Sequence, residues 1–302
     1  MKLSYLILRN IKMFFKDKGL VISSLITPMI LIVLYVTFLK NVYVDSFNNA
    51  VKEVGIVVDS KYINGFVYGW LFSSLLAVSG VTVSFCSNLL MVQDKVTGAI
   101  HDLEIAPVGK YKLAIAYYIA SMSVTMIIIL IEMIVGFIIM ACNGWLLEVK
   151  DVLLILVSAF ILVNFGTALS STIHHFLTTQ GQMSAVGTLV SSIYGFICGA
   201  YMPISQFGAT LQKILSLLPG TYATNILRYG YERAVLQKLH SECGFPNEVV
   251  STIAENFDIE MYFFGNKVTP LASFLVLTIT VIVLLTVYIC LNIKRSKVKK
   301  IK

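Results

Sequence analysis

Charged residues are scarce in this chain. Only 13% of its 302 residues are Asp, Glu, Lys or Arg, whereas 57% are hydrophobic, and the mean hydropathy is +0.84. A soluble domain carries about a quarter charged residues. The scarcity therefore excludes an ordinary soluble domain and predicts a membrane protein with several spans. At this length the spans leave room for modest loops but not for a large extra domain.

The sequence also lacks the motifs of nucleotide and hydrolytic chemistry. It contains no GxxxxGK[ST] loop and no GxGxxG after a strand, so we expect no nucleotide site. It has no GxSxG elbow, and its adjacent histidines, His174 and His175, do not form an HExxH motif. Adjacent residues on a helix point to different faces, so we expect these histidines to cap a helix or to face water. The sequence predicts no catalytic residues and a protein that is not an enzyme.

The five cysteines form no CxxC pair and show no spacing typical of a metal site. We therefore expect no metal ion. Cys86, Cys198 and Cys290 lie in apolar segments, where cysteine behaves as a small apolar residue. A disulfide between Cys142 and Cys243 is left open by the sequence.

Long apolar segments alternate with polar connections. About 20 apolar residues suffice to cross a bilayer as a helix. Pro28 is expected to kink the first such segment, and residues 40–68 after it are expected to be a polar loop in which only residues 54–59 resemble a strand. We predict an all-α polytopic membrane protein, a single transmembrane domain over residues 1–302 with six spans at residues 19–39, 69–90, 113–140, 152–173, 183–202 and 268–291.

Residues 1–18 have the pattern of a helix that lies along the membrane surface. Leu3, Ile7, Ile11 and Phe14 recur at steps of four, four and three, so they share one helical face. The basic residues lie off this stripe, which is typical of an interfacial amphipathic helix. Such a helix is either a charged anchor or a mechanical element. The apolar run that follows lacks a small-residue cleavage site, so we expect no cleavable signal peptide. The basic residues off the stripe are Lys2, Arg9, Lys12 and Lys16.

Basic residues are concentrated in three segments. Residues 1–18 hold five of them, residues 91–112 three and residues 294–302 six, which is 14 of the 23 Lys and Arg. Because cytoplasmic segments carry an excess of Lys and Arg, we expect both termini and residues 91–112 to be cytoplasmic, and residues 203–267 to be external. This orientation suits a plasma or inner cell membrane. Topology and anionic lipid then explain the net charge of +7, so we expect no nucleic acid partner.

Residues 91–112 form a polar connection between two predicted spans. Asp94, Lys95, Asp102 and Glu104 are expected to lie on a short helix that Pro107 ends, and Gly98 in its middle permits a turn between two helical pieces. The residues alone leave two interpretations open, a solvated connector or a docking element that passes force into the adjoining spans. The charged side chains that a partner would contact are Asp94, Lys95, Asp102 and Glu104.

Glu132 is the one carboxylate well inside a predicted span. Placing a charge there costs about 2.5–3.5 kcal/mol on insertion scales. Either Glu132 lines a substrate path or a seam between subunits, or it lies near the outer end of a long tilted helix and reaches water.

Residues 203–267 contain a short apolar piece. Residues 207–218 are too few to cross the bilayer and are typical of a re-entrant or interfacial helix, which Pro219 and Gly220 are expected to stop. We expect residues 221–239 to be helical and residues 241–266 to be an acidic, polar connection.

The order of these parts resembles the permease subunits of ABC-2-type exporters. RNIKMFFKDKG before a first span with ITPM is similar to the elbow helix of that family. MVQDKVTGAIHDLEIAPVGKYKLAIAYY is similar to the segment whose coupling helix sits in a groove of the ATPase. GAYMPISQFGATLQKILSLLPGTYATNILRYG is similar to the external re-entrant signature, with Pro203, Pro219, Tyr222 and Arg228 at its marked positions.

Two departures accompany the resemblance. Gln93, Asp94 and Lys95 stand where the family often has two or more glutamates, and residues 241–266 are longer than the usual connection.

The resemblance implies a transport subunit that binds no cofactor itself. Two permeases, of like or unlike sequence, would pair in the bilayer, and ABC ATPase subunits beneath them would bind ATP and Mg. The cargo would be an amphipathic or hydrophobic drug, lipid-linked molecule or peptide. Arg9, Lys12 and Lys16 would belong to the elbow helix. The residues expected to contact the ATPase would be Asp94, Lys95, Asp102, Glu104 and Pro107.

Three aromatic residues of the fifth predicted span, Tyr194, Phe196 and Tyr201, either line the cargo path or simply pack. Two other functional classes remain as alternatives. An ion-driven secondary transporter would need charged or broken helices near the midplane, often in repeated halves. An intramembrane enzyme would need at least two converging catalytic groups in the membrane.

Overall fold

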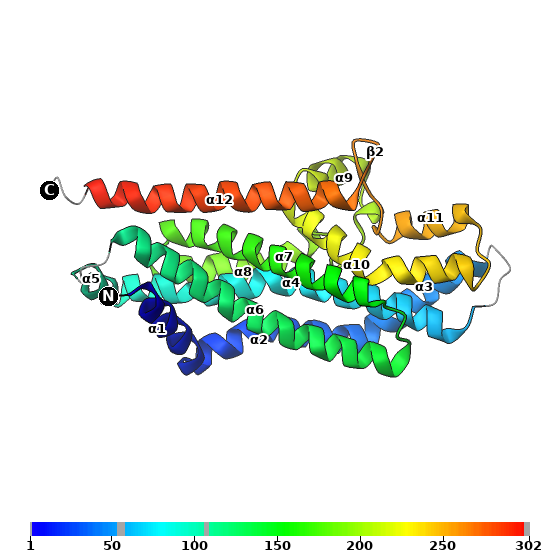
Figure 1. The fold of residues 1–302 in the computed structure, drawn as a ribbon, viewed down its shortest axis with the longest axis horizontal. Helices are drawn as coiled ribbons and strands as arrows, with labels where there is room; N and C mark the ends of the chain where they lie inside the picture. Colours follow the sequence, from blue (N-terminus) through cyan, green and yellow to red (C-terminus); the bar gives the residue numbers. More distant parts are fainter. Residues whose placement is uncertain (1, 53–57, 106–108, 299–302) are drawn as a thin grey trace.

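The computed structural model describes residues 2–52, 58–105 and 109–298. They form a bundle of long helices with one small hairpin (Figure 1). The start of the first helix, the end of the last helix and the short helix α5 lie at the same end of the bundle (Figure 1). The elements are α1 (Leu3–Lys16), α2 (Lys18–Leu34), the π-helical turn η1 (Tyr35–Leu39), α3 (Lys40–Lys52), α4 (Ser60–Val96), α5 (Ala99–Ile105), α6 (Lys110–Asn143), α7 (Val149–Phe176), α8 (Gln180–Ile197), the 3₁₀ turn η2 (Ile204–Gln206), α9 (Ala209–Ser216), α10 (Pro219–Ser241), α11 (Asn247–Asn256), β1 (Met261–Phe263), β2 (Asn266–Val268) and α12 (Pro270–Val298).

The helix α4 is the centre of the bundle. It packs against α2, α6, α7, α8 and α10, and every residue from Gly65 to Phe85 is buried. A helix that is apolar or small on all sides is stable only when it is surrounded. With 37 residues, α4 is about 55 Å long at 1.5 Å per residue. The predicted span at residues 69–90 is therefore the middle of a longer helix.

Small and hydroxyl-bearing residues allow α7 to approach α4 closely. A Cβ atom added to Gly166 would stand 2.5 Å from the carbonyl oxygen of Gly80, so residue 166 needs glycine or a shift of the backbone, whereas a Cβ atom added to Gly80 would stand 2.5 Å from the Leu162 side chain. Just beyond this crossing, the Ser84 hydroxyl lies 3.4 Å from the Thr125 hydroxyl of α6 and 3.3 Å from the Thr167 hydroxyl of α7. Such contacts between small polar residues commonly stabilise the packing of membrane helices against one another.

Five helical stretches in the described residues are long and apolar enough to cross a membrane, and each includes most of one predicted span. The fifth predicted span, residues 183–202, is not among them. The helix there, α8, has 18 residues and begins with Gln180, Gly181 and Gln182, so its first turn is polar. The five stretches are Lys18–Asn49, Ser60–Val96, Tyr111–Asn143, Val149–Phe176 and Pro270–Ile293.

The polar loop predicted for residues 40–68 is largely helical instead. Pro28 lies inside α2, and the chain continues through η1 into α3. Tertiary packing explains the difference, because Phe47 is fully buried and the rings of Tyr43 and Trp70 are 4.2 Å apart. The strand-like run at residues 54–59 lies mostly outside the described residues.

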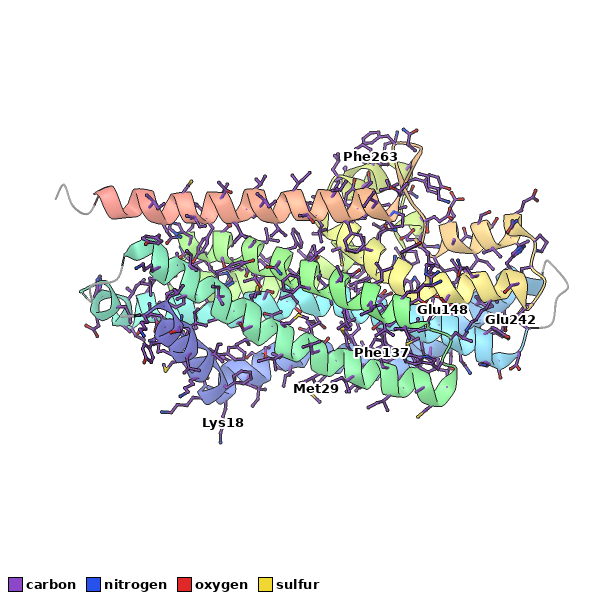
Figure 2. All side chains as sticks on the ribbon, viewed as in Figure 1. Lys18, Met29, Phe137, Glu148, Glu242 and Phe263 are labelled. Carbon is purple, nitrogen blue, oxygen red and sulfur yellow. The ribbon has the colours of Figure 1, made fainter. Side chains whose placement is uncertain are left out.

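The region from residue 203 to 267 is more ordered than its polarity predicts. The short apolar piece forms α9, and Pro219 begins α10 rather than only ending α9, as proline does readily in the first helical turn. The helix predicted at residues 221–239 is confirmed as part of α10. Instead of a simple polar connection, α11 and the hairpin β1–β2 follow, with Phe263 on the hairpin (Figure 2).

All five cysteines carry free thiols, including Cys142 and Cys243. The disulfide that the sequence left open is therefore not formed in the structure.

Candidate functional site: a helix junction beside α5

Arg9 of α1 joins the ends of α4 and α6. Its guanidinium donates two hydrogen bonds to the Asp94 carboxylate of α4, at 2.5 and 3.0 Å. The Tyr117 hydroxyl of α6 donates a third, at 2.5 Å. The Asp94 side chain is only 6% exposed, and a bidentate charged pair of this kind is both strong and directional. The hydrogen bonds with Asp94 raise the pKa of Arg9. Three helices are thus fixed to one carboxylate.

Lys95, the next residue of α4, closes the end of α7. Its Nζ donates hydrogen bonds to the backbone carbonyls of His174, His175 and Leu177, at 2.8, 2.9 and 3.0 Å. Carbonyls at a helix C-terminus lack the N–H donors of a following helical turn, although the His174 carbonyl also accepts a hydrogen bond from the Leu177 N–H. The helix dipole also favours a cation at this end.

Replacing Lys95 with methionine is expected to loosen the last turn of α7. The change keeps most of the side-chain length but removes the charge and the three donors, at a cost of about 1–2 kcal/mol for a partly buried C-terminal cation. Hydrogen exchange of the amides near residues 174–177 is the measurement, with Lys12→Met on the exposed face of α1 as the control. Equal protection in the two variants would contradict this role.

The two histidines before Leu177 do not face water. His174 is fully buried and His175 is 9% exposed. The His174 Nδ1 lies 2.8 Å from the Ser170 carbonyl oxygen, and its ring packs against Phe85. The expectation that both residues cap the helix or face water was wrong, because α4 extends far enough to cover the end of α7.

The polar segment after Asp94 divides at Gly98, as predicted. Gly98 has φ +84°, a conformation that glycine adopts at little cost, and α5 begins at the next residue. Asp94 and Lys95 were predicted to share a short helix with Asp102, but they belong to α4, whereas Asp102 is exposed on α5. The side chain of Glu104 and all of Pro107 lie outside the described residues.

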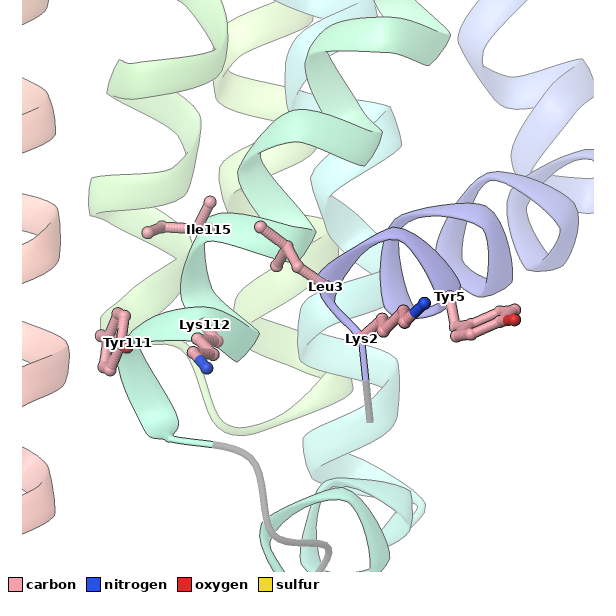
Figure 3. Close-up of a pocket in the computed structure, with 6 residues that line it drawn as sticks. All are labelled: Lys2, Leu3, Tyr5, Tyr111, Lys112 and Ile115. Atoms are coloured by element: carbon pink, nitrogen blue, oxygen red, sulfur yellow. The ribbon is translucent and has the colours of Figure 1, made fainter.

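A groove runs beside this junction, between the start of α1 and the start of α6 (Figure 3). Its volume is about 710 Å³. Lys2 and Lys112 give it positive charge, and Tyr5 and Tyr111 give it aromatic surface. Lys12 and Lys16 of α1 are also exposed. The end of the bundle that carries α5 therefore offers both a basic groove and an exposed acidic residue.

A second cluster lies away from α5 and centres on Arg228, which is 1% exposed. Its Nη2 donates to the Gly199 carbonyl at 2.5 Å and to the Ser74 hydroxyl at 3.2 Å. Its Nη1 lies 3.4 Å from an Asp258 carboxylate oxygen, and the guanidinium lies 4.5 Å from the centre of the Trp70 ring. Burial lowers the pKa of Arg228 and raises that of Asp258, while the opposite charge of each partner opposes the shift.

Asp258 was not predicted from the sequence. Its carboxylate accepts hydrogen bonds from the backbone N–H groups of Ile204 and Ser205, just after Pro203, which is buried. The one feature of the local sequence that marks Asp258 is that it precedes an apolar run in an acidic segment. Of the other marked residues, Pro219 starts α10 and Tyr222 is buried. The structure thus brings the beginning and the end of the re-entrant signature together.

The residues proposed for a cargo path do not share one surface. Phe196 is exposed, whereas Tyr194 is buried, and Tyr201 packs edge-on against Phe196 with ring centres 5.1 Å apart. Glu132 is 5% exposed, and neither carboxylate oxygen has a hydrogen-bond partner among the described residues. Glu132 therefore does not reach water at the outer end of its helix.

Comparison with known proteins identifies the family of this chain. The family model described as ABC-2 type transporter matches residues 1–231, which includes both the junction around Asp94 and the cluster up to Arg228. A search of curated proteins gives no significant match. Because the matched region covers most of the sequence, and because its helices are those of a multi-pass membrane protein, the chain belongs to the ABC-2 type transporter family.

Proposed function

We propose that this permease subunit exports an amphipathic or hydrophobic cargo, with the energy supplied by a separate ABC ATPase. Subunits of this family normally pair with such ATPases. The observation that carries the proposal is the junction of Arg9, Asp94 and Tyr117, because it joins a surface helix rigidly to the central helix of the bundle.

The junction suits the transmission of force. Only Thr97 and Gly98 separate α4 from α5, and Lys95 ties the same end of α4 to α7. A displacement of α5 or α1 would therefore move the ends of α4, α6 and α7 together. Since α4 contacts most of the other spans, this movement would reach the whole subunit.

Asp94 and Lys95 have a different role in this scheme from direct contact with the ATPase. Both side chains are engaged within the chain. We propose that they hold the coupling elements in place, and that Asp102, Glu104 and Pro107 of the α5 region dock the ATPase, together with the groove between Lys2 and Lys112. Arg9 then belongs to the junction, and Lys12 and Lys16 lie against anionic lipid headgroups.

The remaining features of the proposal follow from this orientation. Both termini and α5 would be cytoplasmic, in the plasma or inner membrane, and α8 would also cross the membrane, which brings the number of spans to six. The exposed residues Leu189, Ile193 and Phe196 of α8 suit contact with a second permease. Glu132 is buried by its own chain, so movements inside one subunit would change its surroundings. ATP and Mg would be bound by the ATPase.

Reversing the charge of Asp102 and Glu104 together, as Asp102→Lys and Glu104→Lys, is expected to abolish stable association with the ATPase. The reason is that two acidic residues of the α5 segment would become basic, and like charges across an interface cost several kcal/mol, of order 10²-fold or more in affinity. Co-purification of the ATPase in mild detergent, identified by mass spectrometry, is the measurement.

The matched control is Asp45→Lys, an equally exposed acid on α3. It should leave the amount of bound ATPase unchanged. If the α5 variant retained the ATPase at the wild-type ratio while remaining monodisperse, α5 would not be the docking element. Absence of any P-loop ATPase from the wild-type preparation would reject ATP-driven transport itself and favour an ion-driven transporter.

A further inference from the structure

A cleft of about 700 Å³ opens among η2, α9, α10, α11 and the hairpin β1–β2. This volume is in the range of small-molecule sites. The apolar residues Ile204, Met261, Tyr262 and Phe264 form one part of its lining, and polar and charged residues form the rest. Arg228 lines it too, and its buried Nε–H has no acceptor among the described residues.

The cleft lies beside the start of the stretch in α12 that is long and apolar enough to cross a membrane. The hairpin ends at Val268, and the span in α12 begins at Pro270, so the hairpin stands where that span enters the bilayer. Leu271, the second residue of that span, is 69% exposed, as expected for a lipid-facing residue. The helix α9 lies beside the hairpin (Figure 1) and contacts β1, and both carry exposed apolar side chains, with Phe263 on the hairpin (Figure 2). These side chains include Leu211, Ile214, Leu217, Phe263 and Phe264.

Two charges at the cleft are available to a ligand. Lys213 of α9 and Glu255 of α11 both line it and are exposed, and in the part of the chain that the structure describes neither makes an ion pair. The other charged lining residues are engaged. Asp258 pairs with Arg228, and Glu260 pairs with Lys267 at 2.6 Å. The cleft therefore presents one free cation and one free anion above an apolar wall.

We propose that this cleft binds phosphatidylethanolamine from the adjacent leaflet. The phosphate lies toward Lys213 and the Nε–H of Arg228, the ammonium group donates hydrogen bonds to Glu255, and the acyl chains follow Tyr262, Phe264 and the exposed face of α9. A choline headgroup has no N–H to donate, and a glycerol headgroup has no positive charge for Glu255. The site is independent of the ATP-driven transport proposed above.

Binding of short-chain phosphatidylethanolamine to the full-length chain in detergent tests the proposal. Native mass spectrometry counts bound lipid during titration, with phosphatidylcholine and phosphatidylglycerol in parallel. Lys213→Ala and Glu255→Ala are each expected to weaken phosphatidylethanolamine binding about threefold, the scale of an exposed charge contact, and the double variant about tenfold. Glu255→Ala is expected to reduce the preference for phosphatidylethanolamine over phosphatidylglycerol, because phosphatidylglycerol never used the carboxylate.

Two exposed residues outside the cleft provide the controls. Lys61→Ala of α4 and Glu248→Ala of α11 should bind as the wild type does, and size-exclusion profiles should be alike for the five variants and the wild type. Equal binding by the double variant and the wild type would overturn the proposal. Equal affinity for the three lipids would also overturn it, as would equally tight binding of glycerophosphoethanolamine, which has the headgroup but no acyl chains.

Discussion

Replacing Arg228 with methionine is expected to destabilise the folded protein strongly. The Asp258 side chain is 16% exposed, and the change removes the cation that pairs with its carboxylate. It also removes the donor of the hydrogen bond to the Gly199 carbonyl. Removing one partner of a buried ion pair typically costs about 3–5 kcal/mol, which is a large share of the stability of an ordinary domain. Fluorescence-detected size-exclusion chromatography after graded heating measures the loss.

A second substitution separates charge from packing. In Arg228→Met with Asp258→Asn, the uncompensated carboxylate is gone, and the amide oxygen can still accept from one of the two N–H groups of Ile204 and Ser205, so stability should partly return. Lys150→Met removes a surface pair with Glu148, whose partners are 62% and 45% exposed, and should change stability by less than about 1 kcal/mol. An Arg228→Met protein as heat-resistant as the wild type would show that the cluster does not hold this region together.

Breaking the junction is expected to separate ATP hydrolysis from transport. Arg9→Ala removes both bonds from α1 to Asp94, and Asp94→Ala removes the carboxylate that α1 and α6 share. Because hydrogen bonds to charged groups contribute about 1.5–3 kcal/mol, the two substitutions should be strongly non-additive in a double-mutant cycle. The cycle is measured by thermal stability of the reconstituted permease and ATPase.

The functional readout is the ratio of cargo transported to ATP hydrolysed. It should fall at least tenfold in Arg9→Ala, while the ATPase stays bound through α5. Lys12→Ala, on the same helix but exposed, should keep the wild-type ratio. Strictly additive stabilities together with an unchanged ratio would show that the pair is only an anchor.

The spans could be predicted because hydropathy is a local property. The bilayer demands about 20 apolar residues in a row, and the segments that supply them are visible without any knowledge of their neighbours. The ends of these helices were less predictable. The helix α4 continues to Val96 because Asp94 and Lys95 find partners on α1, α6 and α7, and such partners leave no mark in the segment itself. The same reason turned a predicted loop into α3, where buried Phe47 and Tyr43 pack on the bundle.

The candidate sites were predictable only in part. Arg228 and Pro203 stood out because they belong to a recognisable arrangement of residues, whereas Asp258 lies 30 positions after Arg228 and has no motif around it. Arg9 and Asp94 were both noted, but 85 residues separate them, and no periodicity connects positions so distant. Pairings of this kind depend on how the helices pack, which a single sequence does not encode locally.

The complete enclosure of α4 between Gly65 and Phe85 has a consequence for the route of the cargo. The middle of a lone subunit is occupied by a helix rather than by a lumen, so the centre of one chain by itself is closed. Under the export function proposed above, a molecule that crosses the bilayer would travel along the outside of the bundle, in contact with lipid or with a neighbouring subunit. The chain would then form one side of the transport path, and lipid or a second subunit would form the other side.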